Sequence, residues 1–515
     1  MVRSIMNRRK RKKNSQPQQH KYPQNLSKQL TSNVNNLKQI LGEPHDLKIR
    51  QLKLGEGNIT CAITYIDGLV DAKTVQVSIL ENLENAKQLP TEGKELFQHI
   101  YNKLLSVIHV EKGKTLDEIT LPLLSGSTLL YIDGVETALI VDTSGGEMRS
   151  IEEPVTETLI RGPREGFIEN LQTNLAIIRR HIKDPNLRFK THQTGRRSKK
   201  NLVVAYVDGI VNPALVKEVE RRLQSIDIDI VLESGYVEGW IEDSFLSPFP
   251  QIMNSERPDK VVAALMQGKV AILLEGTPFA LLMPINFSNI LQSAEDRYER
   301  WIIGTLLRGL RYFAAFLSIF LPALYVSLLT LQPGMLPSML AFSIAASREG
   351  VPFPPLIEAF MMLFTMELLQ EAGARLPQTI GQTIGIVGGL VIGEAAVQAG
   401  IVSPIMVIIV ALTAISNFAI PAYSIAISFR IIRFGFLFAS GIFGLYGIIL
   451  AYIMVNIHFV NLKSFGVPYS TPFAPFFKRD FHDVIVRSPI HQIKDRPEYL
   501  QPQDTVSMDN QGEKK

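Results

Sequence analysis

The chain of 515 residues has little of what disulfide bonding, metal binding or catalysis requires. Its single cysteine, Cys61, excludes an intramolecular disulfide framework, and its place in the apolar run 59–66 predicts a buried strand position. The nine histidines never pair at the spacing of metal ligands. No Walker loop, GxSxG elbow or HExxH helix occurs. The sequence therefore predicts a protein that is not an enzyme and that uses no cofactor or metal.

Charge is absent from long stretches of the C-terminal half. Residues 312–347 form a run of 36 positions without a charged side chain, and 395–429 form a run of 35. About 20 apolar residues in a helix cross the hydrocarbon core of a bilayer. We therefore expect an all-α polytopic membrane domain over 299–462. Its four predicted crossings are 312–331, 378–399, 402–428 and 434–460.

Two further segments of this domain stay ambiguous and allow five or six crossings. Pro333, Gly334 and Pro337 break the first run, so residues 335–347 form either a re-entrant piece or a short second span. Residues 356–373 carry three glutamates, which favours an interfacial amphipathic helix or one buried in protein. These glutamates are Glu358, Glu367 and Glu371. Arg430 and Arg433 would lie in the loop between the last two spans.

The two ends of the chain are polar. Residues 1–45 are basic and then rich in Gln and Asn, which predicts disorder, and residues 463–515 are predicted to be a polar tail. The basic run 8–13 is able to contact anionic lipid or nucleic acid, but a solvated tail without a nucleic-acid partner is favoured. No apolar signal-peptide region follows Met1–Lys13. The N-terminal half is therefore expected on the cytoplasmic side.

An internal duplication organises the region before the membrane domain. The octapeptide ITYIDGLV at 63–70 reappears as VAYVDGIV at 204–211, displaced by 141 residues. TLLYIDGV at 128–135 corresponds to VAILLEGT at 270–277, displaced by 142. Each copy reads as strands that end in acid–Gly turns and are followed by helices. The sequence thus predicts an α/β N-terminal domain of two duplicated subdomains, 46–160 and 161–298.

One predicted membrane helix combines regularly spaced glycines with polar ends. Glycine every fourth residue lets helix backbones approach closely, and these packing positions are Gly381, Gly385, Gly389 and Gly393. The same helix carries polar residues at its ends and an apolar constriction between them. These pore-lining candidates are Gln378, Gln382, Ile386, Val387, Leu390 and Glu394. The residues alone leave two interpretations open, a pore wall or a tightly packed bundle helix.

Several longer motifs are similar to one known family. They include RGPREGFIEN at 161–170, EGTPF at 275–279, LPALY at 321–325 and EAGARLP at 371–377. On these motifs most of residues 155–475 resembles the A subunits of spore germinant receptors, the GerA family. The resemblance implies a place in the spore inner membrane and a complex with a transporter-like B subunit and a lipoprotein C subunit. It also implies a ring of A subunits that forms an ion channel, with the glycine helix as its wall.

Three functions follow as hypotheses. The first is a nutrient-gated cation channel subunit that starts germination, which the glycine helix and the resemblance favour. The second is a secondary transporter that binds the nutrient itself, suggested by intramembrane glutamates such as Glu358, Glu367 and Glu394. No inverted repeat within 299–462 supports it. The third is a membrane-anchored signalling scaffold or accessory germination protein.

Overall fold

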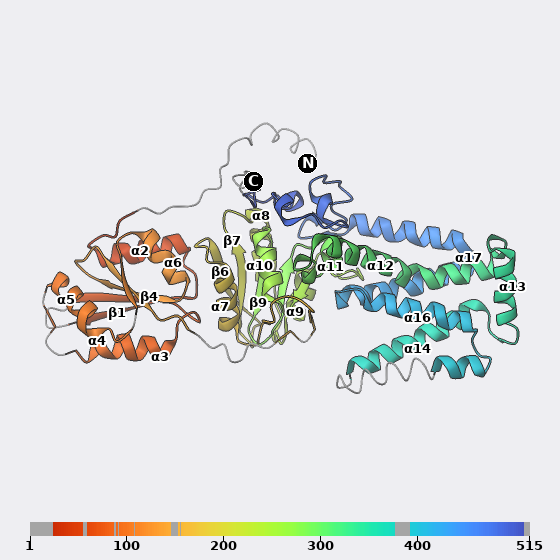
Figure 1. The fold of residues 1–515 in the computed structure, drawn as a ribbon, viewed down its shortest axis with the longest axis horizontal. Helices are drawn as coiled ribbons and strands as arrows, with labels where there is room; N and C mark the ends of the chain where they lie inside the picture. The colour runs from red at the N-terminus through yellow and green to blue at the C-terminus, as the bar shows by residue number, and fades with distance from the viewer. Residues whose placement is uncertain are drawn as a thin grey trace. The chain divides into compact units, whose positions relative to one another are not determined.

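The chain divides into two units in the computed structural model, and we name them the polar unit and the helical unit (Figure 1). The polar unit comprises Met1–Glu242, Ile252–Pro284 and Pro489–Lys515, and the helical unit comprises Asp243–Gln251 and Ile285–Ser488. The structure describes residues 24–54, 59–86, 89–90, 92–107, 109–145, 153–154, 156–375 and 392–508. The helical unit thus begins before residue 299, where the sequence placed the start of the membrane domain.

The first subdomain of the polar unit is an antiparallel sheet in the order β1-β2-β4-β5-β3. Its strands are β1 Leu47–Leu54, β2 Ile59–Ile66, β3 Val110–Gly113, β4 Ser127–Ile132 and β5 Ala138–Asp142. Its helices are α2 Leu30–Leu41, α3 Ala72–Thr74, η2 Val75–Glu81, α4 Asn82–Glu84, α5 Gly93–His99, η3 Ile100–Leu104 and α6 Leu116–Leu124. Figure 1 shows α2 and α6 on one face of this sheet and α3, α4 and α5 on the other.

Alternating side chains of the central strands bury both faces of this sheet. In β2, Ala62 and Ile66 face α2 and α6, whereas Cys61 and Ile63 face the helical stretch that begins with α3. This period of two is what a strand covered on both sides requires. Cys61 is fully buried, as predicted, and burial raises the pKa of its thiol to about 12. A thiol in that state is not a reactive nucleophile.

The second subdomain repeats the first. Its sheet has the order β6-β7-β9-β10-β8, again antiparallel. Its strands are β6 Leu187–Thr194, β7 Lys200–Val207, β8 Met253–Ser255, β9 Val270–Leu274 and β10 Ala280–Met283. Its helices are α7 Leu171–His181, α8 Pro213–Gln224, α9 Ser234–Ile241 and α10 Pro258–Met266. The acid–Gly pairs form the predicted turns, with Gly134 at φ 84° and Gly276 at φ 82°.

The duplication extends further toward the N-terminus than the sequence indicated. In the first copy Asn33 bonds both the N–H and the carbonyl of Ser27, and Asn174, 141 residues later, bonds both groups of Ile168. Helices α2 and α7 are therefore equivalent. The prediction of disorder over 1–45 is wrong for α2, because this helix buries one apolar side chain per turn. These side chains are Leu30, Val34, Leu37 and Leu41.

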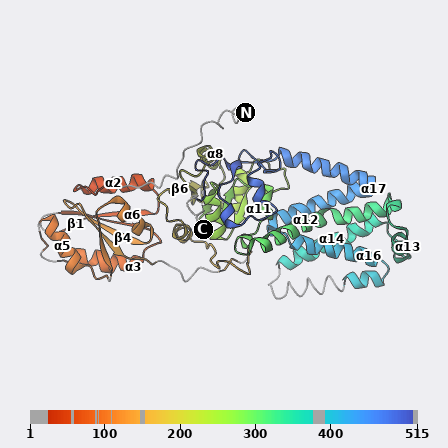
Figure 2. The same ribbon diagram turned by 45° about the horizontal axis from the view of Figure 1, so that its top comes forward.

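The helical unit contains the apolar segments. Its first helices are α11 Phe287–Leu291, η4 Ala294–Arg297, α12 Trp301–Thr330, η5 Pro333–Met335, α13 Ser338–Ser347 and α14 Pro355–Arg375. Residues 392–398 are helical, and α16 Pro404–Phe418 and α17 Tyr423–Asn461 follow. Among the described helices, α12 and α17 are long and apolar enough to cross a membrane. They lie side by side in both views (Figures 1 and 2).

Helix α17 folds back on itself at Gly444. The ring of Phe287 lies 6.4 Å from that of Phe429 and 4.9 Å from that of Phe459, measured between ring centroids. In a straight helix these two residues would be about 45 Å apart. Gly444 has φ 63° and ψ −141°, a conformation almost restricted to glycine. The single range of α17 thus covers two helices that run in opposite directions.

The predicted boundaries of the crossings need correction. The first span begins at Trp301 rather than 312, so Arg308 and Arg311 lie inside α12 instead of before it. The span 402–428 is wrong as drawn because the chain breaks at 419–422, around Pro421, and the span 434–460 is wrong because the helix folds back at Gly444. Helix α13, with ten residues, is only about 15 Å long and cannot cross a bilayer. Most of the predicted crossing 378–399 lies outside the described residues.

The described part of the predicted polar tail is divided between the units, with residues 463–488 in the helical unit and residues 489–508 in the polar unit. In the helical unit, strands β11 Lys463–Ser464 and β12 Val467–Pro468 pair, and η6 Asp480–Asp483 follows. The backbone carbonyl of Tyr469 accepts a hydrogen bond from the backbone N–H of Phe287. In the polar unit, η7 Ile490–Gln492 and η8 Glu498–Leu500 precede Gln503, whose N–H bonds the carbonyl of Ile210.

Candidate functional site

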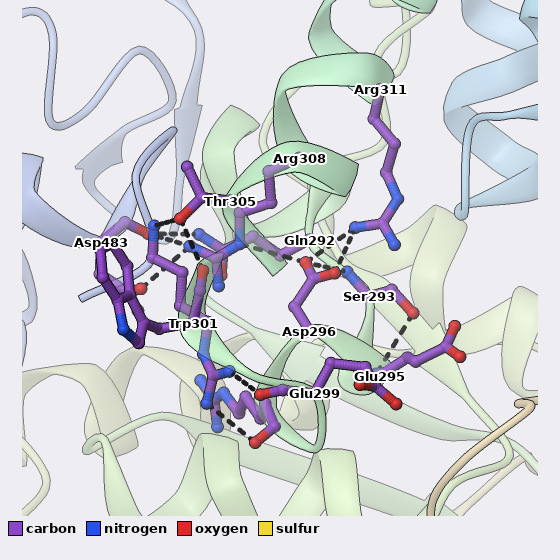
Figure 3. Close-up of polar contacts among 12 residues, drawn as sticks. Gln292, Ser293, Glu295, Asp296, Glu299, Trp301, Thr305, Arg308, Arg311 and Asp483 are labelled. Atoms are coloured by element: carbon purple, nitrogen blue, oxygen red, sulfur yellow. Dashed lines mark hydrogen bonds and ion pairs between the residues drawn. The ribbon is translucent and has the colours of Figure 1, made fainter. Parts of the chain in front are cut away.

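A buried carboxylate joins the turn before α12 to the helix itself. Asp296 in η4 accepts from Arg308 Nε at 3.1 Å and from Arg311 Nη1 at 2.7 Å (Figure 3). Its carboxylate also accepts from the backbone N–H of Ser293 at 3.2 Å, which completes a capping box. Arg308 and Arg311 are three residues apart and so share one face of α12. One negative charge thus compensates two cations at the start of the first span.

The C-terminal segment completes this cluster. Arg308 Nη1 donates to the backbone oxygen of Asp483 at 2.8 Å and to its carboxylate at 2.9 Å. Arg487 bonds the carbonyls of Arg297 and Glu299. Burial and the nearby Arg308 lower the pKa of Arg487 from its ordinary value. These contacts fix the chain near residue 485 against the start of α12.

A second ion-pair cluster lies between α14 and α17. Glu367 accepts from Arg430 Nη1 at 2.9 Å and from Arg433 Nη2. Gln370 accepts a further bond from Arg430 at 3.2 Å. Arg430 and Arg433 are therefore not loop residues, as the hydropathy pattern suggested. Their charges are tolerated inside α17 because Glu367 faces them across the packing interface.

A third cluster involves Glu358, whose side chain is fully buried. Its carboxylate pairs with Arg348 and accepts from both the backbone N–H and the hydroxyl of Ser403, each at 2.6 Å. The Ser403 hydroxyl accepts in turn from the N–H of Met406 and caps α16. Glu358 therefore joins the start of α14 to the start of α16.

The arginine partners of Glu358 and Glu367 help to interpret segment 356–373. The sequence left two interpretations for it, an interfacial amphipathic helix or a helix buried in protein. Glu358 and Glu367 each pair with arginine inside the helical unit, so the acidic side of α14 is packed in protein, whereas Ile357, Phe360, Phe364 and Leu368 are exposed on it. Both carboxylates are fully engaged by side chains of the same chain. The intramembrane glutamates that suggested a substrate site therefore act as structural ion pairs at these two positions.

The predicted pore helix is described only at its C-terminal end. Gln378, Gln382, Ile386, Val387 and Leu390 lie outside the described residues, and the glycines Gly381, Gly385 and Gly389 lie there too. Gly393 is described and buried, and a Cβ on it would stand 3.2 Å from Cγ1 of Val407 in α16. Ala396 and Val397 pack in the same direction, into the apolar cluster around α16.

The exposed side of residues 392–398 is polar in part, because it carries Glu394 and Gln398 as well as Ile392 and Ala395. Glu394 is exposed, and its Oε1 accepts from Nε2 of Gln398 one turn later at 3.2 Å. Successive positions on an α-helix are 100° apart, so these two side chains lie on the side away from Gly393, Ala396 and Val397. This short helix therefore presents a carboxylate and an amide group outward.

Sequence reasoning did not single out Asp296, Arg308 or Asp483 as a cluster. The pattern Ser293-x-x-Asp296 before an apolar run is a capping signal and indicates the turn. Nothing local indicates Asp483, because it lies 175 residues after Arg308. Within the described ranges, no group of three or more His, Cys, Asp or Glu side chains is arranged to hold a metal ion.

Comparison with known proteins places these features in a family. The profile of the family described as Bacillus/Clostridium GerA spore germination protein matches residues 35–499. Spore germination protein GerLA of Bacillus cereus is 50% identical over 466 residues, which cover 90% of this chain and 94% of that protein. Spore germination protein KA of Bacillus subtilis (strain 168) is 44% identical over 490 residues, which cover 95% of this chain and 90% of that protein.

A solved structure is also similar. It is the crystal structure of the N-terminal domain of the A subunit of the Bacillus megaterium spore germinant receptor GerK3, with 34% sequence identity and a TM-score of 0.41. The match covers 52% of this chain and 99% of the solved one. Because the family profile spans nearly the whole chain and the relatives align over nine-tenths of it, this chain belongs to the GerA family of spore germination proteins.

Proposed function

We propose that the chain is the A subunit of a nutrient germinant receptor and that several copies assemble as a ring around a cation path. Opening of this path would start germination. The receptor role is supported by the family and by the names of its relatives. These relatives are spore germination proteins, and the alignments cover nearly their whole length. In this proposal a transporter-like B subunit takes the nutrient, a lipoprotein C subunit completes the complex, and the chain itself catalyses no reaction.

The outward polar face of residues 392–398 is the observation that carries the channel role. A carboxylate on the outside of an apolar unit is unfavourable against lipid, at about 2.5 kcal/mol or more near the bilayer centre. A ring of copies would remove Glu394 and Gln398 from lipid and turn them toward a shared aqueous path. The sequence-predicted pore positions 378–390 precede this face on the same segment.

The proposed location is the spore inner membrane, with the polar unit on the cytoplasmic side. The two exposed arginines Arg297 and Arg300 stand just before α12, and positive residues beside a first span favour the cytoplasmic side. Lys478 and Arg479 follow the last helix and point to the same side for both ends of the helical unit. Accessibility of a cysteine placed at Arg300 to an impermeant maleimide, in inverted and right-side-out vesicles, tests this orientation.

Currents from the complete receptor in planar bilayers test the channel role. The wild-type complex should conduct cations on nutrient addition, whereas a complex lacking this chain should stay silent. Ile386→Ala and Val387→Ala widen the predicted constriction and should conduct without nutrient. If both variants assemble normally and stay silent, and Gly389→Leu is equally harmless, the pore assignment is wrong. Currents that persist without this chain would instead favour a signalling scaffold.

A further inference from the structure

The segment after the last helix exposes a cluster of aromatic rings. Phe473, Phe476 and Phe481 are 41%, 64% and 39% exposed. Phe481 lies 5.6 Å from each of the other two rings, so the three form one patch within nine residues. Single exposed apolar residues are common on soluble surfaces, but contiguous aromatic patches mark a binding surface.

Both ends of this aromatic patch are held on the helical unit. Before it, the side chain of Asn286 bonds the hydroxyl of Thr471 at 3.3 Å, and both residues are buried. After it, Asp483 binds Arg308 of α12, and the N–H of Arg487 bonds the hydroxyl of Thr305 at 3.1 Å. The patch is therefore fixed beside the first turns of α12, the end at which this span begins.

The apolar surface continues from the aromatic patch onto α12. Ile485 and Val486, which lead from the patch to the contact with Thr305, are 39% and 54% exposed. On α12 itself Trp301, Ile302 and Leu306 are 44%, 63% and 64% exposed. Tryptophan at the end of a span is typical of the membrane–water boundary. The patch thus lies at the level where the lipid-facing surface of α12 starts.

A basic residue lies within the aromatic patch. Lys478 is exposed and stands in sequence between Phe476 and Phe481. Aromatic rings beside a lysine match the boundary region of an anionic bilayer, where rings insert between headgroups and cations meet phosphates. We propose that residues 473–486 form an interfacial anchor that inserts the three rings beside α12 and binds anionic phospholipid headgroups through Lys478.

The patch area favours lipid over a second copy of the chain. A phenylalanine buries roughly 150–250 Å² at most, so the three partly exposed rings alone offer about 300 Å². A stable protein interface needs about 800 Å² from each partner, and the remaining apolar surface belongs to α12, a candidate span whose exposed side faces lipid. Lipid insertion requires no such minimum, since each buried CH₂ group contributes about 0.8 kcal/mol independently. The anchor does not depend on whether the chain conducts ions.

Site-specific fluorescence quenching in the full chain tests the anchor. The chain has two tryptophans, Trp240 and Trp301, which are replaced by phenylalanine before Phe476→Trp is introduced. In nanodiscs with phosphatidylglycerol, lipids brominated near the headgroup should quench the new tryptophan at least two-fold more than aqueous iodide does. The matched control is Leu121→Trp in the same background, at a position 57% exposed on α6. It should be quenched by iodide and not by brominated lipid.

A charge reversal tests headgroup binding separately. Lys478→Glu should abolish the increase in lipid quenching that phosphatidylglycerol gives over phosphatidylcholine alone. Lys53→Glu changes the net charge equally at an exposed site of the polar unit and should leave that increase intact. Equal quenching at 476 and 121 by iodide would overturn the anchor. Shielding of position 476 from both quenchers, lost on dilution, would overturn it in favour of contact between copies.

Discussion

Arg179 and Asp46 form a buried, two-pronged ion pair between the two subdomains of the polar unit. Nε of Arg179 donates to one carboxylate oxygen at 2.6 Å and Nη2 donates to the other at 3.0 Å. Asp46 lies in the turn before β1 of the first copy, whereas Arg179 is on α7 of the second. The guanidinium also lies 4.8 Å from the ring of Phe189. The duplicated halves thus share one charge-paired contact that neither could form alone.

Asp46→Asn should destabilise the polar unit by about 3–5 kcal/mol, because the arginine would remain buried without its counter-charge. Replacing both residues, with Asp46→Leu and Arg179→Met, should cost clearly less than the sum of the two single changes. Hydrogen exchange of α7 peptides in the full chain measures the effect. Arg197→Ala breaks an exposed pair with Asp229 and serves as the control, expected within about 1 kcal/mol of wild type. Additive single changes would show that the pair is not coupled.

Gly444→Ala should weaken the helical unit because the turn of α17 needs glycine at this position. Strain from a side chain at φ 63° costs about 1–3 kcal/mol, and a Cβ would also meet the side chain of Gln332 at 2.4 Å. Gly435→Ala is the matched control in the same helix, where a Cβ meets nothing within 4 Å. Unfolding in mixed SDS–detergent micelles should separate the two variants. Equal stability would contradict the fold-back at this residue.

Asp296→Asn should release the C-terminal segment from the start of α12. Arg308 and Arg311 would lose their shared carboxylate, at a cost of about 3 kcal/mol or more for the buried Arg308. Faster proteolysis within residues 473–488 is the expected result. Glu295→Gln, next to it in η4, should leave the cleavage rate within two-fold of wild type. Adding Arg308→Met to Asp296→Asn should restore no protection, because the bonds from Arg308 to Asp483 are then lost and Arg311 still lacks its carboxylate.

The sequence revealed the duplication because its signals are local. Each copy carries two acid–Gly turns whose glycines adopt positive φ, and these turns recur at displacements of 141 and 142 residues. Helix α2 was missed because it lies in a segment, 1–45, that is basic and rich in Gln and Asn, although Leu30, Val34 and Leu37 follow helical spacing. Composition describes the exposed side of such a helix, whereas spacing describes the buried one.

The errors in the helical unit come from partners that are distant in sequence. Arg430 interrupts an apolar run and so looks like a loop residue, but Glu367, 63 positions earlier, neutralises it inside the bundle. The fold-back at Gly444 left no local signal either, since Gly441 and Gly447 nearby look the same in sequence. Hydropathy therefore locates apolar segments correctly and misplaces their ends wherever charges are paired across helices.

Stability of α9 should depend on pH through Glu238. Burial, with Glu242 and Glu233 nearby, raises the pKa of Glu238 from 4.5 to about 7. Between those values the folded chain binds more protons than the unfolded chain, so stability falls as pH rises and the contribution is lost above pH 7. The shift corresponds to about 3 kcal/mol at most. Protection of α9 from hydrogen exchange, corrected for intrinsic rates, should weaken from pH 5 to pH 8.

Glu238→Gln is the control for this pH effect. A glutamine keeps the shape of the protonated acid and does not titrate, so protection of α9 should be nearly constant over the same range. At pH 8 the variant should exceed wild type in protection, and at pH 5 the two should converge. A wild-type profile that is flat, or one that strengthens toward pH 8, would show that Glu238 titrates as an ordinary surface carboxylate.

Moving the charge at residue 394 should change cation conductance if its helix lines the path. Glu394→Gln removes a carboxylate that concentrates cations at the mouth, so conductance at low ionic strength should fall roughly two- to ten-fold. The deficit should nearly vanish at 1 M salt, where charges are screened within about 3 Å. Adding Gln398→Glu returns the charge one turn away on the same exposed face and should recover most of the conductance. This swap preserves composition and net charge. Recovery of conductance would show that the charge acts from this exposed face, as a pore lining requires. A swap variant as defective as Glu394→Gln alone would instead point to a general effect on assembly.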